Sequence, residues 1–281
     1  MVTVNAGAGA PAVKPGADAP IGVFDSGIGG LTVVRELNRQ LPDERIVYFG
    51  DTARLPYGPK SPDTVRRYSR EIGAYLLEQG VKAIVVACNT ATAHALTTLQ
   101  AEMPVPVIGV VEPGARAAVD STHTGSIGVI GTIGTINSGA YERAVRSMLP
   151  DATITTRACP LFVPLVEEGW TDREVTRMVA REYLSPLAAA HVDAVVLGCT
   201  HYPLLKPILH EVLGDGVQLI DSAERTAFET GRVLREAGLA APAGGKGGHR
   251  FIASDAPEQF LRLGQRFLGG AIDRVETVTL G

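Results

Sequence analysis

Cysteine is scarce in this chain, with only Cys88, Cys159 and Cys199 among 281 residues. An odd and small number in a chain of this length excludes a disulfide framework. None of the three stands in a C-x-x-C spacing, which argues against a zinc knuckle or a thioredoxin-like pair. The thiols therefore suit a reducing compartment, and we expect a cytoplasmic protein.

Clustered positive charge and long apolar runs are also missing. The formal net charge is −4, and no Lys and Arg cluster of the kind that a nucleic-acid surface needs is present. No apolar stretch approaches the roughly 20 residues that cross a bilayer. The sequence predicts a protein that binds neither nucleic acid nor membranes. A small anionic substrate stays possible, because local charge rather than the total decides binding.

Two segments have compositions that do not favour packed structure. Residues 1–20 are rich in Ala, Gly and Pro and lack the basic and apolar regions of a signal peptide. We expect them to form a disordered extension. The Gly-rich stretch Ala241–Gly248 is expected to be a flexible surface loop.

Short apolar runs rich in β-branched residues alternate with helical stretches along the rest of the chain. Such runs are typical of strands in a parallel sheet that is covered on both faces. The alternation predicts a doubly wound α/β fold. Helix starts are marked by Ser61 before Pro62 and by the capping-box spacing of Thr171 and Glu174. The expected strands are Ile21–Phe24, Ile46–Phe49, Ala83–Ala87, Val107–Val111, Ile127–Ile130, Ala194–Gly198 and Val217–Ile220.

The chain contains an internal repeat. Val81–Cys88 matches Val192–Cys199 at four of eight positions, 111 residues further on, and Ile21–Phe24 matches Ile127–Ile130 at an offset of 106. A single pair of similar apolar strands would mean little, but two pairs occur in the same order at nearly the same offset. The repeat predicts two similar α/β units, each with a cysteine at the end of a strand.

Cys88 and Cys199 are therefore the candidate reactive residues. Ligands of doubly wound sheets bind beyond the carboxyl ends of the strands, where both cysteines are expected. Each precedes a polar residue and a predicted helix, whose N–H groups and dipole favour the thiolate. If the two units face each other, the sulfurs meet in one cleft, roughly 7 Å apart for two near-attack contacts to one carbon. Two opposed acid/base groups are what inversion of a stereocentre requires.

Other polar residues near the strand ends could support this chemistry. Asp25 ends the first expected strand, and its counterpart in the second unit is Gly131. His201 follows Cys199 by two residues. This asymmetry suggests that Asp25 serves the Cys88 side and His201 the Cys199 side, each by taking a proton or tuning a thiol pKa. Hydrogen-bond donors that could stabilise enolate-like charge are Ser26, Asn89, Thr90 and Thr200.

Plainer interpretations apply to several residues. Cys159, followed by Pro160, is expected to be a small buried apolar residue. The segment Asp25–Gly30 lacks the spacing of a Rossmann or P-loop nucleotide site. His94 and His210 lie on predicted helices and are assigned no role. On local grounds alone, the Tyr57–Gly58 pair looks like an ordinary turn.

Taken together, several motifs are more specific than any one of them. In order along residues 21–238 they are Val23–Val33 (VFDSGIGGLTV), Gly50–Asp51, Pro56–Pro59 (PYGP), Ala87–Ala91 (ACNTA), Gly128–Thr132 (GVIGT), Cys159–Pro164 (CPLFVP) and Leu197–Leu205 (LGCTHYPLL). With these motifs the chain resembles the aspartate/glutamate racemase family, and within it the glutamate racemases of bacterial cell-wall synthesis.

The resemblance implies two similar α/β domains with parallel-rich sheets, related by pseudo-symmetry, and an active site in the cleft between them. It implies interconversion of L- and D-glutamate without pyridoxal phosphate or a metal, and so without a cofactor. By the motif match, Cys88 and Cys199 are the two acid/base residues, and Glu167 assists near the second, although the adjacent Glu168 leaves the register open. The residues implied to line the substrate site are Asp25, Ser26, Tyr57, Gly58, Asn89, Thr90, Thr200 and His201.

The resemblance also implies a domain division and an assembly. We expect residues 21–111 and 222–281 to form the first domain and residues 112–221 the second. Family members are commonly dimers, so a homodimer is expected.

Three alternatives to glutamate racemisation stay open at this point. One is racemisation of aspartate, although aspartate racemases usually place Glu where this chain has His201. Another is a two-lobed binding protein for a small anion, which would not need paired thiols. The third is a thiol redox protein, which would require Cys88 and Cys199 to form a disulfide.

Overall fold

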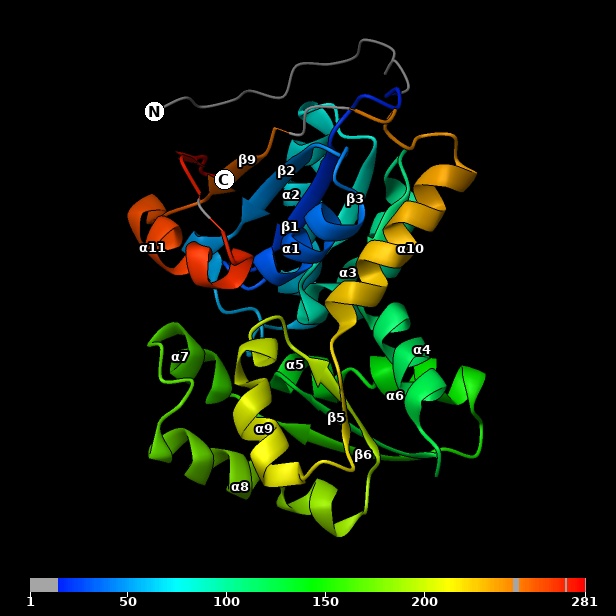
Figure 1. Ribbon diagram of the computed structural model, residues 1–281. Helices are drawn as coiled ribbons and strands as arrows, with labels where there is room; N and C mark the ends of the chain where they lie inside the picture. The colour runs from blue at the N-terminus through cyan, green and yellow to red at the C-terminus, as the bar shows by residue number, and fades with distance from the viewer. Residues whose placement is uncertain (1–14, 245–247, 271, 281) are drawn as a thin grey trace.

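The computed structural model describes residues 15–244, 248–270 and 272–280. These residues form two lobes, each built around a parallel β-sheet (Figure 1). The first sheet has the order β10-β9-β2-β1-β3-β4, and the second has the order β6-β5-β7-β8. The strands of the first sheet are β1 (Ile21–Asp25), β2 (Ile46–Gly50), β3 (Ala83–Val86), β4 (Val107–Gly109), β9 (Arg250–Ala253) and β10 (Val275–Thr277). Those of the second are β5 (Ser126–Gly131), β6 (Thr153–Ala158), β7 (Ala194–Gly198) and β8 (Gln218–Ile220).

The internal repeat is present in the sheet topology. The order β2-β1-β3-β4 corresponds strand for strand to β6-β5-β7-β8. The register corresponds as well, because Ile21 pairs with Ala83 in the first sheet and Ile127 pairs with Ala194 in the second. The expected α/β class with two similar parallel-sheet units is confirmed.

Helices cover both faces of each sheet, as the continuous apolar strands require. On the first sheet, α2 (Pro62–Glu78) and α3 (Asn89–Glu102) pack on one face, and α1 (Leu31–Gln40) and α11 (Pro257–Leu268) pack on the other. On the second, α4 (Val111–Ser121) and α6 (Ala140–Met148) face α8 (Glu174–Ala189) and α9 (Lys206–Leu213) across the sheet. The shorter elements are η1 (Thr52–Arg54), α5 (Ile133–Asn137), α7 (Phe162–Glu167) and η2 (Tyr202–Leu205).

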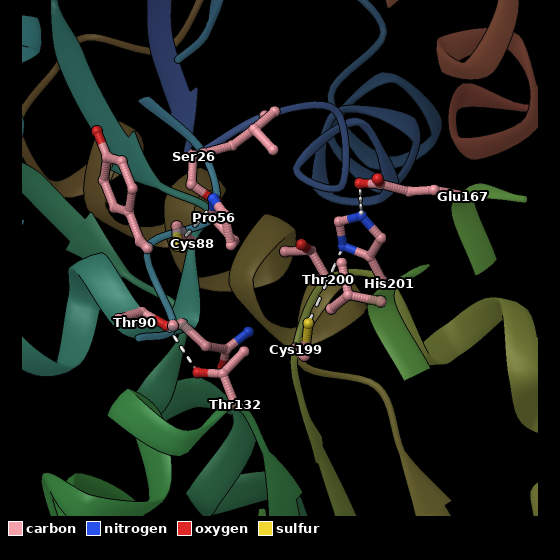
Figure 2. Close-up of a pocket in the computed structure, with 15 residues that line it drawn as sticks. Ser26, Pro56, Cys88, Thr90, Thr132, Glu167, Cys199, Thr200 and His201 are labelled. Carbon is pink, nitrogen blue, oxygen red and sulfur yellow. Dashed lines mark hydrogen bonds and ion pairs between the residues drawn. The ribbon is translucent and has the colours of Figure 1, made fainter. Parts of the chain in front are cut away.

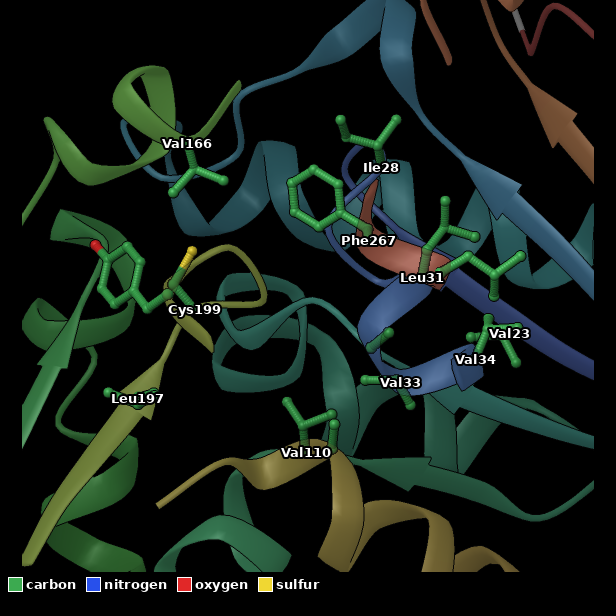
Figure 3. Packing of buried hydrophobic residues seen from close by; sticks show 14 of the residues in the cluster. Val23, Ile28, Leu31, Val33, Val34, Val110, Val166, Leu197, Cys199 and Phe267 are labelled. Atoms are coloured by element: carbon green, nitrogen blue, oxygen red, sulfur yellow. The ribbon is translucent and has the colours of Figure 1, made fainter. Parts of the chain in front are cut away.

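One buried apolar cluster runs through both lobes (Figure 3). It joins Val23 and Leu31 of the first unit to Val166 and Leu197 of the second, and it includes Cys199. Burial of apolar area is the main stabilising contribution to such a contact. The two lobes are therefore held together by the same apolar core that surrounds the strand ends.

Some expectations for the elements were wrong or incomplete. Val110 is the N-cap of α4, so Val110 and Val111 start a helix instead of extending β4. Thr171 does not cap α8, whose N-cap is Arg173, because residues 170–173 form the link after α7. The cap at Ser61 is confirmed, since its side chain accepts a hydrogen bond from Thr64 N.

Three strands were not predicted. The edge strand β6 is rich in Thr and only partly buried, so its sequence lacks a continuous apolar run. The strands β9 and β10 are short, with four and three residues, and each carries charged residues. An apolar-run criterion detects continuous apolar runs and misses strands that are partly exposed or interrupted by charged residues.

The connection between the lobes passes through α4 and α10 (Ser222–Glu236). Helix α4 packs on α6 and β7 of the second unit, and α10 packs on both α1 and α4. The described strands of the second sheet fall between residues 126 and 220, and those of the first lie on either side. On this basis we propose the division into residues 21–111 with 222–281 and residues 112–221.

The two low-complexity segments lie partly outside the described residues. Residues 1–14 of the expected disordered extension and residues 245–247 of the expected flexible loop are outside them. Residues 15–20 are described and lead into β1, and Pro242, Ala243 and Gly244 are exposed. Within the described residues, no helix is both long and apolar enough to span a membrane.

A buried ion pair between Lys82 and Glu44 links several chain segments of the first unit. Lys82 is fully buried, and its Nζ lies 2.5 Å from Glu44 Oε2 and 2.5 Å from the carbonyl oxygen of Ala17. Glu44 Oε1 also accepts a hydrogen bond of 2.8 Å from Ala241 N. Four chain segments therefore meet at one pair of opposite charges, which the sequence did not reveal.

This pair predicts a large difference between single and double substitution. Lys82→Met should lower the free energy of unfolding by about 3–5 kcal/mol, because Glu44 is left as an unpaired buried charge. Lys82→Met with Glu44→Leu should recover most of that loss. Urea denaturation measures both. As a matched control, Arg70→Met breaks the exposed Arg70–Glu102 pair and should cost less than about 1 kcal/mol. A loss as small as that control for Lys82→Met would contradict this account.

Candidate active site

The Cys88 thiol lies at the junction between β3 and α3. Cys88 is the N-cap of α3, and its Sγ accepts a hydrogen bond of 3.5 Å from Ala91 N. The thiol donates to Ser26 Oγ at 3.8 Å. Ser26 follows the last residue of β1, which pairs with β3. The carboxyl ends of two adjacent parallel strands thus place a thiol and a hydroxyl side by side.

The Cys199 thiol lies at the equivalent junction after β7. Its Sγ is 4.0 Å from His201 Nδ1, and His201 Nε2 is 2.9 Å from Glu167 Oε1. A 3-10 helix, η2, stands between this junction and α9, so Cys199 does not directly precede an α-helix as the sequence suggested. The thiol, imidazole and carboxylate form a chain that fixes the imidazole tautomer and can move a proton.

Both thiols line one pocket between the lobes. Figure 2 shows Cys88 and Cys199 on opposite walls of this pocket. The lining residues come from both lobes and enclose a small space around the two thiols. All three cysteines are free and buried. Cys159, with 0% exposure, packs in the apolar core as expected.

Most of the expected site residues lie on this pocket. Those on its wall are Ser26, Tyr57, Gly58, Cys88, Asn89, Thr90, Glu167, Cys199, Thr200 and His201. Asp25 is buried behind the wall, with 1% exposure, and Oδ2 accepts a hydrogen bond of 3.2 Å from Gly27 N. Its predicted contact with substrate stays a prediction. Glu167 contacts His201, whereas Glu168 is the C-cap of α7, so the geometry favours Glu167 as the assisting carboxylate.

Five wall residues were not predicted. They are Gly27, Leu55, Pro56, Thr132 and Val163. The repeat offset of 106 could have identified Thr132, since it places Thr132 opposite Ser26 in the second unit. The others carry no reactive group, and only the fold brings them to the pocket.

Hydrogen bonds join the two lobes at the edge of the pocket. Thr90 Oγ1 of the first unit lies 2.8 Å from Thr132 Oγ1 and 3.2 Å from Thr135 Oγ1 of the second. Gly134 N donates to Gly58 O at 2.9 Å. Both contacts cross the boundary between the lobes, so closure of the lobes and the shape of this wall are coupled.

A buried carboxylate holds the segment that carries Tyr57 and Gly58. Asp51 is fully buried and accepts hydrogen bonds from Tyr57 Oη, Arg54 and Ser254. The expected turn is present, since Lys60 N donates a hydrogen bond of 3.0 Å to Tyr57 O. The Tyr57 side chain is held by its hydrogen bond to Asp51, and Gly58 contacts the second lobe through the hydrogen bond from Gly134 N.

Glycine at position 29 makes the two halves of the site unequal. A Cβ at Gly29 would collide with Thr200 Oγ1 and lie 2.6 Å from His201 Nδ1. The repeat places Thr135 at the equivalent position in the second unit, where it contacts Thr90, the counterpart of His201. The larger His201 ring thus fits only because its neighbour has no side chain.

Burial controls the protonation of both thiols. Burial, and after it the Asp25 carboxylate, raise the pKa of Cys88 to about 12, although the N–H groups of Ala91 and Ser26 lower it. Burial also raises the pKa of Cys199, against the N–H group of His201, which lowers it. The expected effect of the strand–helix junction is present, but desolvation outweighs it. The expectation that these positions favour thiolate was therefore wrong, because burial favours the thiol form of both groups.

Asp25 shows the same dominance of burial. Desolvation raises its pKa, and the nearby His201 and the N–H group of Gly27 lower it. Its Oδ1 atom is buried and has no hydrogen-bond partner in the described part of the chain. A buried carboxyl with a raised pKa beside two thiols can hold a proton.

Neutral donors provide most of the polar surface of the pocket. No Lys or Arg is among its lining residues. The N-termini of α3 and α5 open onto it at Cys88 and Thr132, and helix N-termini attract anions. Asn89 is 3% exposed, and its Nδ2 has no hydrogen-bond partner within residues 15–244, 248–270 and 272–280. Among the described residues, no group of three or more His, Cys, Asp or Glu side chains could hold a metal ion.

Comparison with known proteins gives the family of this site. The sequence profile described as Asp/Glu/Hydantoin racemase matches residues 21–229, which include both thiol junctions. The chain belongs to this racemase family. A glutamate racemase from Geobacter metallireducens is 55% identical over 260 residues, which cover 92% of this chain and 96% of the relative.

Solved structures of racemases in this family have the same fold. Glutamate racemase isoform RacE1 from Bacillus anthracis has a TM-score of 0.89 at 42% identity, covering 93% of this chain and 98% of the other. The glutamate racemase of Francisella tularensis, solved in complex with D-glutamate, has a TM-score of 0.88 at 38% identity, covering 94% and 98%. The resemblance seen in the sequence motifs is confirmed.

The raised thiol pKa of this racemase predicts slow alkylation at neutral pH. Iodoacetamide reacts with thiolate, so the modification rate of native Cys88 should still rise about tenfold per pH unit up to pH 10. In urea the rate should level off above about pH 8.5–9, the ordinary thiol range. Mass spectrometry of the Cys88 peptide measures both rates. A native rate that levels off below pH 8 would show that Cys88 is a thiolate at neutral pH and contradict this account.

Proposed function

We propose that this chain interconverts L- and D-glutamate by exchanging the proton on the α-carbon between two thiols. The observation that carries the proposal is the placement of Cys88 and Cys199 on opposite walls of one pocket. One group removes the proton from one face of the carbon as a thiolate, and the other delivers a proton to the opposite face as a thiol. In the reverse direction the two residues exchange roles.

On the Cys199 side, the proton has a defined acceptor. Glu167 accepts the Nε2 proton of His201, which leaves Nδ1 free to accept the thiol proton at 4.0 Å. The negative Glu167 stabilises the resulting imidazolium. His201 is therefore proposed to generate the Cys199 thiolate when substrate is bound, and Glu167 to orient His201.

On the Cys88 side, the support is different. The thiol is hydrogen-bonded to Ser26 Oγ, and Asp25 influences its pKa through charge. The ammonium group of a bound amino acid would add positive charge near both residues and lower the pKa of the thiol. Because burial, and after it Asp25, raise the pKa of Cys88, the thiolate formed there is a strong base, as removal of a weakly acidic α-proton requires.

The remaining barrier is proposed to be lowered by fixed hydrogen-bond donors. Removal of the α-proton moves negative charge onto the substrate carboxylate, and donors placed in advance stabilise that charge. Asn89 follows Cys88 and Thr200 follows Cys199, so both donors lie beside the groups attached to the reacting carbon. Neutral donors and helix N-termini would bind the substrate carboxylates in place of Lys or Arg.

Glutamate is the substrate that the evidence favours. Relatives of this chain at 50–55% identity are named glutamate racemases, and the Thr200–His201 pair is the form that the sequence motifs associate with glutamate. We propose that the product D-glutamate supplies peptidoglycan synthesis, with neither pyridoxal phosphate nor metal taking part. A cytoplasmic homodimer is the expected form of the enzyme.

Turnover in D₂O tests the two-thiol mechanism. Starting from L-glutamate, the D-glutamate formed should carry deuterium at the α-carbon, while unreacted L-glutamate should initially carry none. The reason is that the thiol that protonates the product has exchanged its hydrogen for deuterium from the solvent. The proton taken from L-glutamate stays on the other thiol. Mass spectrometry of the separated enantiomers measures the deuterium in both. In a separate assay, aspartate at the same concentration should react more slowly than glutamate.

Each other outcome identifies an alternative. Absence of deuterium in both enantiomers would support a binding protein. Deuterium in L-glutamate and D-glutamate from the start would indicate a single exchanging base. Faster turnover of aspartate would overturn the substrate assignment. Full activity of Cys88→Ser would leave the mechanism without one of its bases.

A further inference from the structure

One amide nitrogen among the residues that line the pocket is left without a hydrogen-bond partner in the part of the chain that the structure describes. Asn89 is almost completely buried, yet its Nδ2 has no hydrogen-bond partner among the described residues. Leaving a buried donor unpaired is costly, and such a group in a native protein calls for an explanation. Because Asn89 lines the pocket next to Cys88, the missing acceptor is expected to be an oxygen atom of the ligand.

The other end of the same amide is fixed by a residue from the opposite lobe. Tyr141, on α6 of the second unit, donates a hydrogen bond of 2.7 Å from its hydroxyl to Asn89 Oδ1. An amide whose oxygen is held as an acceptor must present its nitrogen, a donor, on the other side. Rotation of the amide by half a turn would instead present an oxygen to a substrate carboxylate.

The Tyr141 ring is itself placed closely between two glycines. A Cβ at Gly114 would lie 3.2 Å from the Tyr141 hydroxyl oxygen, and a Cβ at Gly198 would lie 3.2 Å from Tyr141 Cε2. Gly198 ends β7 and directly precedes Cys199. Tyr141 thus packs against the strand that presents Cys199, while its hydroxyl holds the residue that follows Cys88.

We propose that Tyr141 is a positioning residue that orients the Asn89 amide, so that its N–H groups donate to the carboxylate on the reacting carbon. The proposal rests on the racemase function argued above. Since Tyr141 and Asn89 belong to different lobes, the donor is correctly oriented only when the lobes are closed. The hydrogen bond therefore links closure of the site to stabilisation of the charge that develops on the carboxylate.

Substitution of the hydroxyl alone tests the proposal. Tyr141→Phe keeps the ring between the two glycines and removes only the donor. We expect kcat/KM for glutamate to fall about tenfold. This is the cost of losing one hydrogen bond that orients the Asn89 amide toward the charged substrate carboxylate. The decrease in kcat/KM should be the same for L-glutamate and for D-glutamate, because no substitution can change the equilibrium constant between the two enantiomers. The matched control is Tyr202→Phe, whose equally buried hydroxyl donates to Cys159 O at 2.8 Å and should change kcat/KM less than about twofold.

A double-mutant cycle separates positioning from a general structural effect. Calorimetry with racemic glutamate gives an apparent affinity without net reaction, so it also applies to variants with little activity. Tyr141→Phe should weaken this affinity in the native background and leave it unchanged in the Asn89→Ala background. An equal weakening in both backgrounds, or none in the native one, would overturn the proposal.

The outcomes also distinguish this inference from the proposed function. If the native protein racemises glutamate and Tyr141→Phe has the same kcat/KM, only the proposed role of Tyr141 is wrong. If the native protein neither binds nor racemises glutamate, the proposed function fails as well.

Discussion

The site depends on the meeting of two parallel sheets at their carboxyl ends. Backbone groups at these ends are free, and the strand–helix junctions place short polar side chains against the cleft. Because β3 and β7 hold equivalent positions in the two sheets, each contributes one thiol, and the repeat itself brings opposed acid/base groups to one pocket. The apolar cluster that runs through both lobes keeps the two junctions in place.

The repeat makes the two halves of the site similar. At a few equivalent positions the two units carry different residues, and there the two halves differ chemically. Position 201 is His where the first unit has Thr90, and Gly29 stands where the second unit has Thr135. The result is a thiol–imidazole–carboxylate chain on one wall and a thiol–hydroxyl pair beside a buried carboxyl on the other. Burial raises the pKa of both thiols, so substrate and neighbouring groups must generate the base.

The sequence predicted the strands with continuous apolar runs, because a strand buried on both faces must be apolar along its length, and it predicted the two thiols through the repeat. It did not predict β6, whose partial burial removes that signal. It also overestimated the helix N-termini, since desolvation of a thiol depends on packing that no local motif records. The contacts of Gly29 with His201 and of Tyr141 with Asn89 join distant segments and require the assembled fold.

The central claim is that two sulfur atoms flank one carbon atom of the substrate. A crystal structure of the protein with bound D-glutamate tests it most directly. The account predicts that the α-carbon lies between Cys88 Sγ and Cys199 Sγ, with one sulfur on each face and each roughly 3.5 Å away, at near-attack distance. Both sulfurs on one face, or an α-carbon in contact with neither, would contradict it.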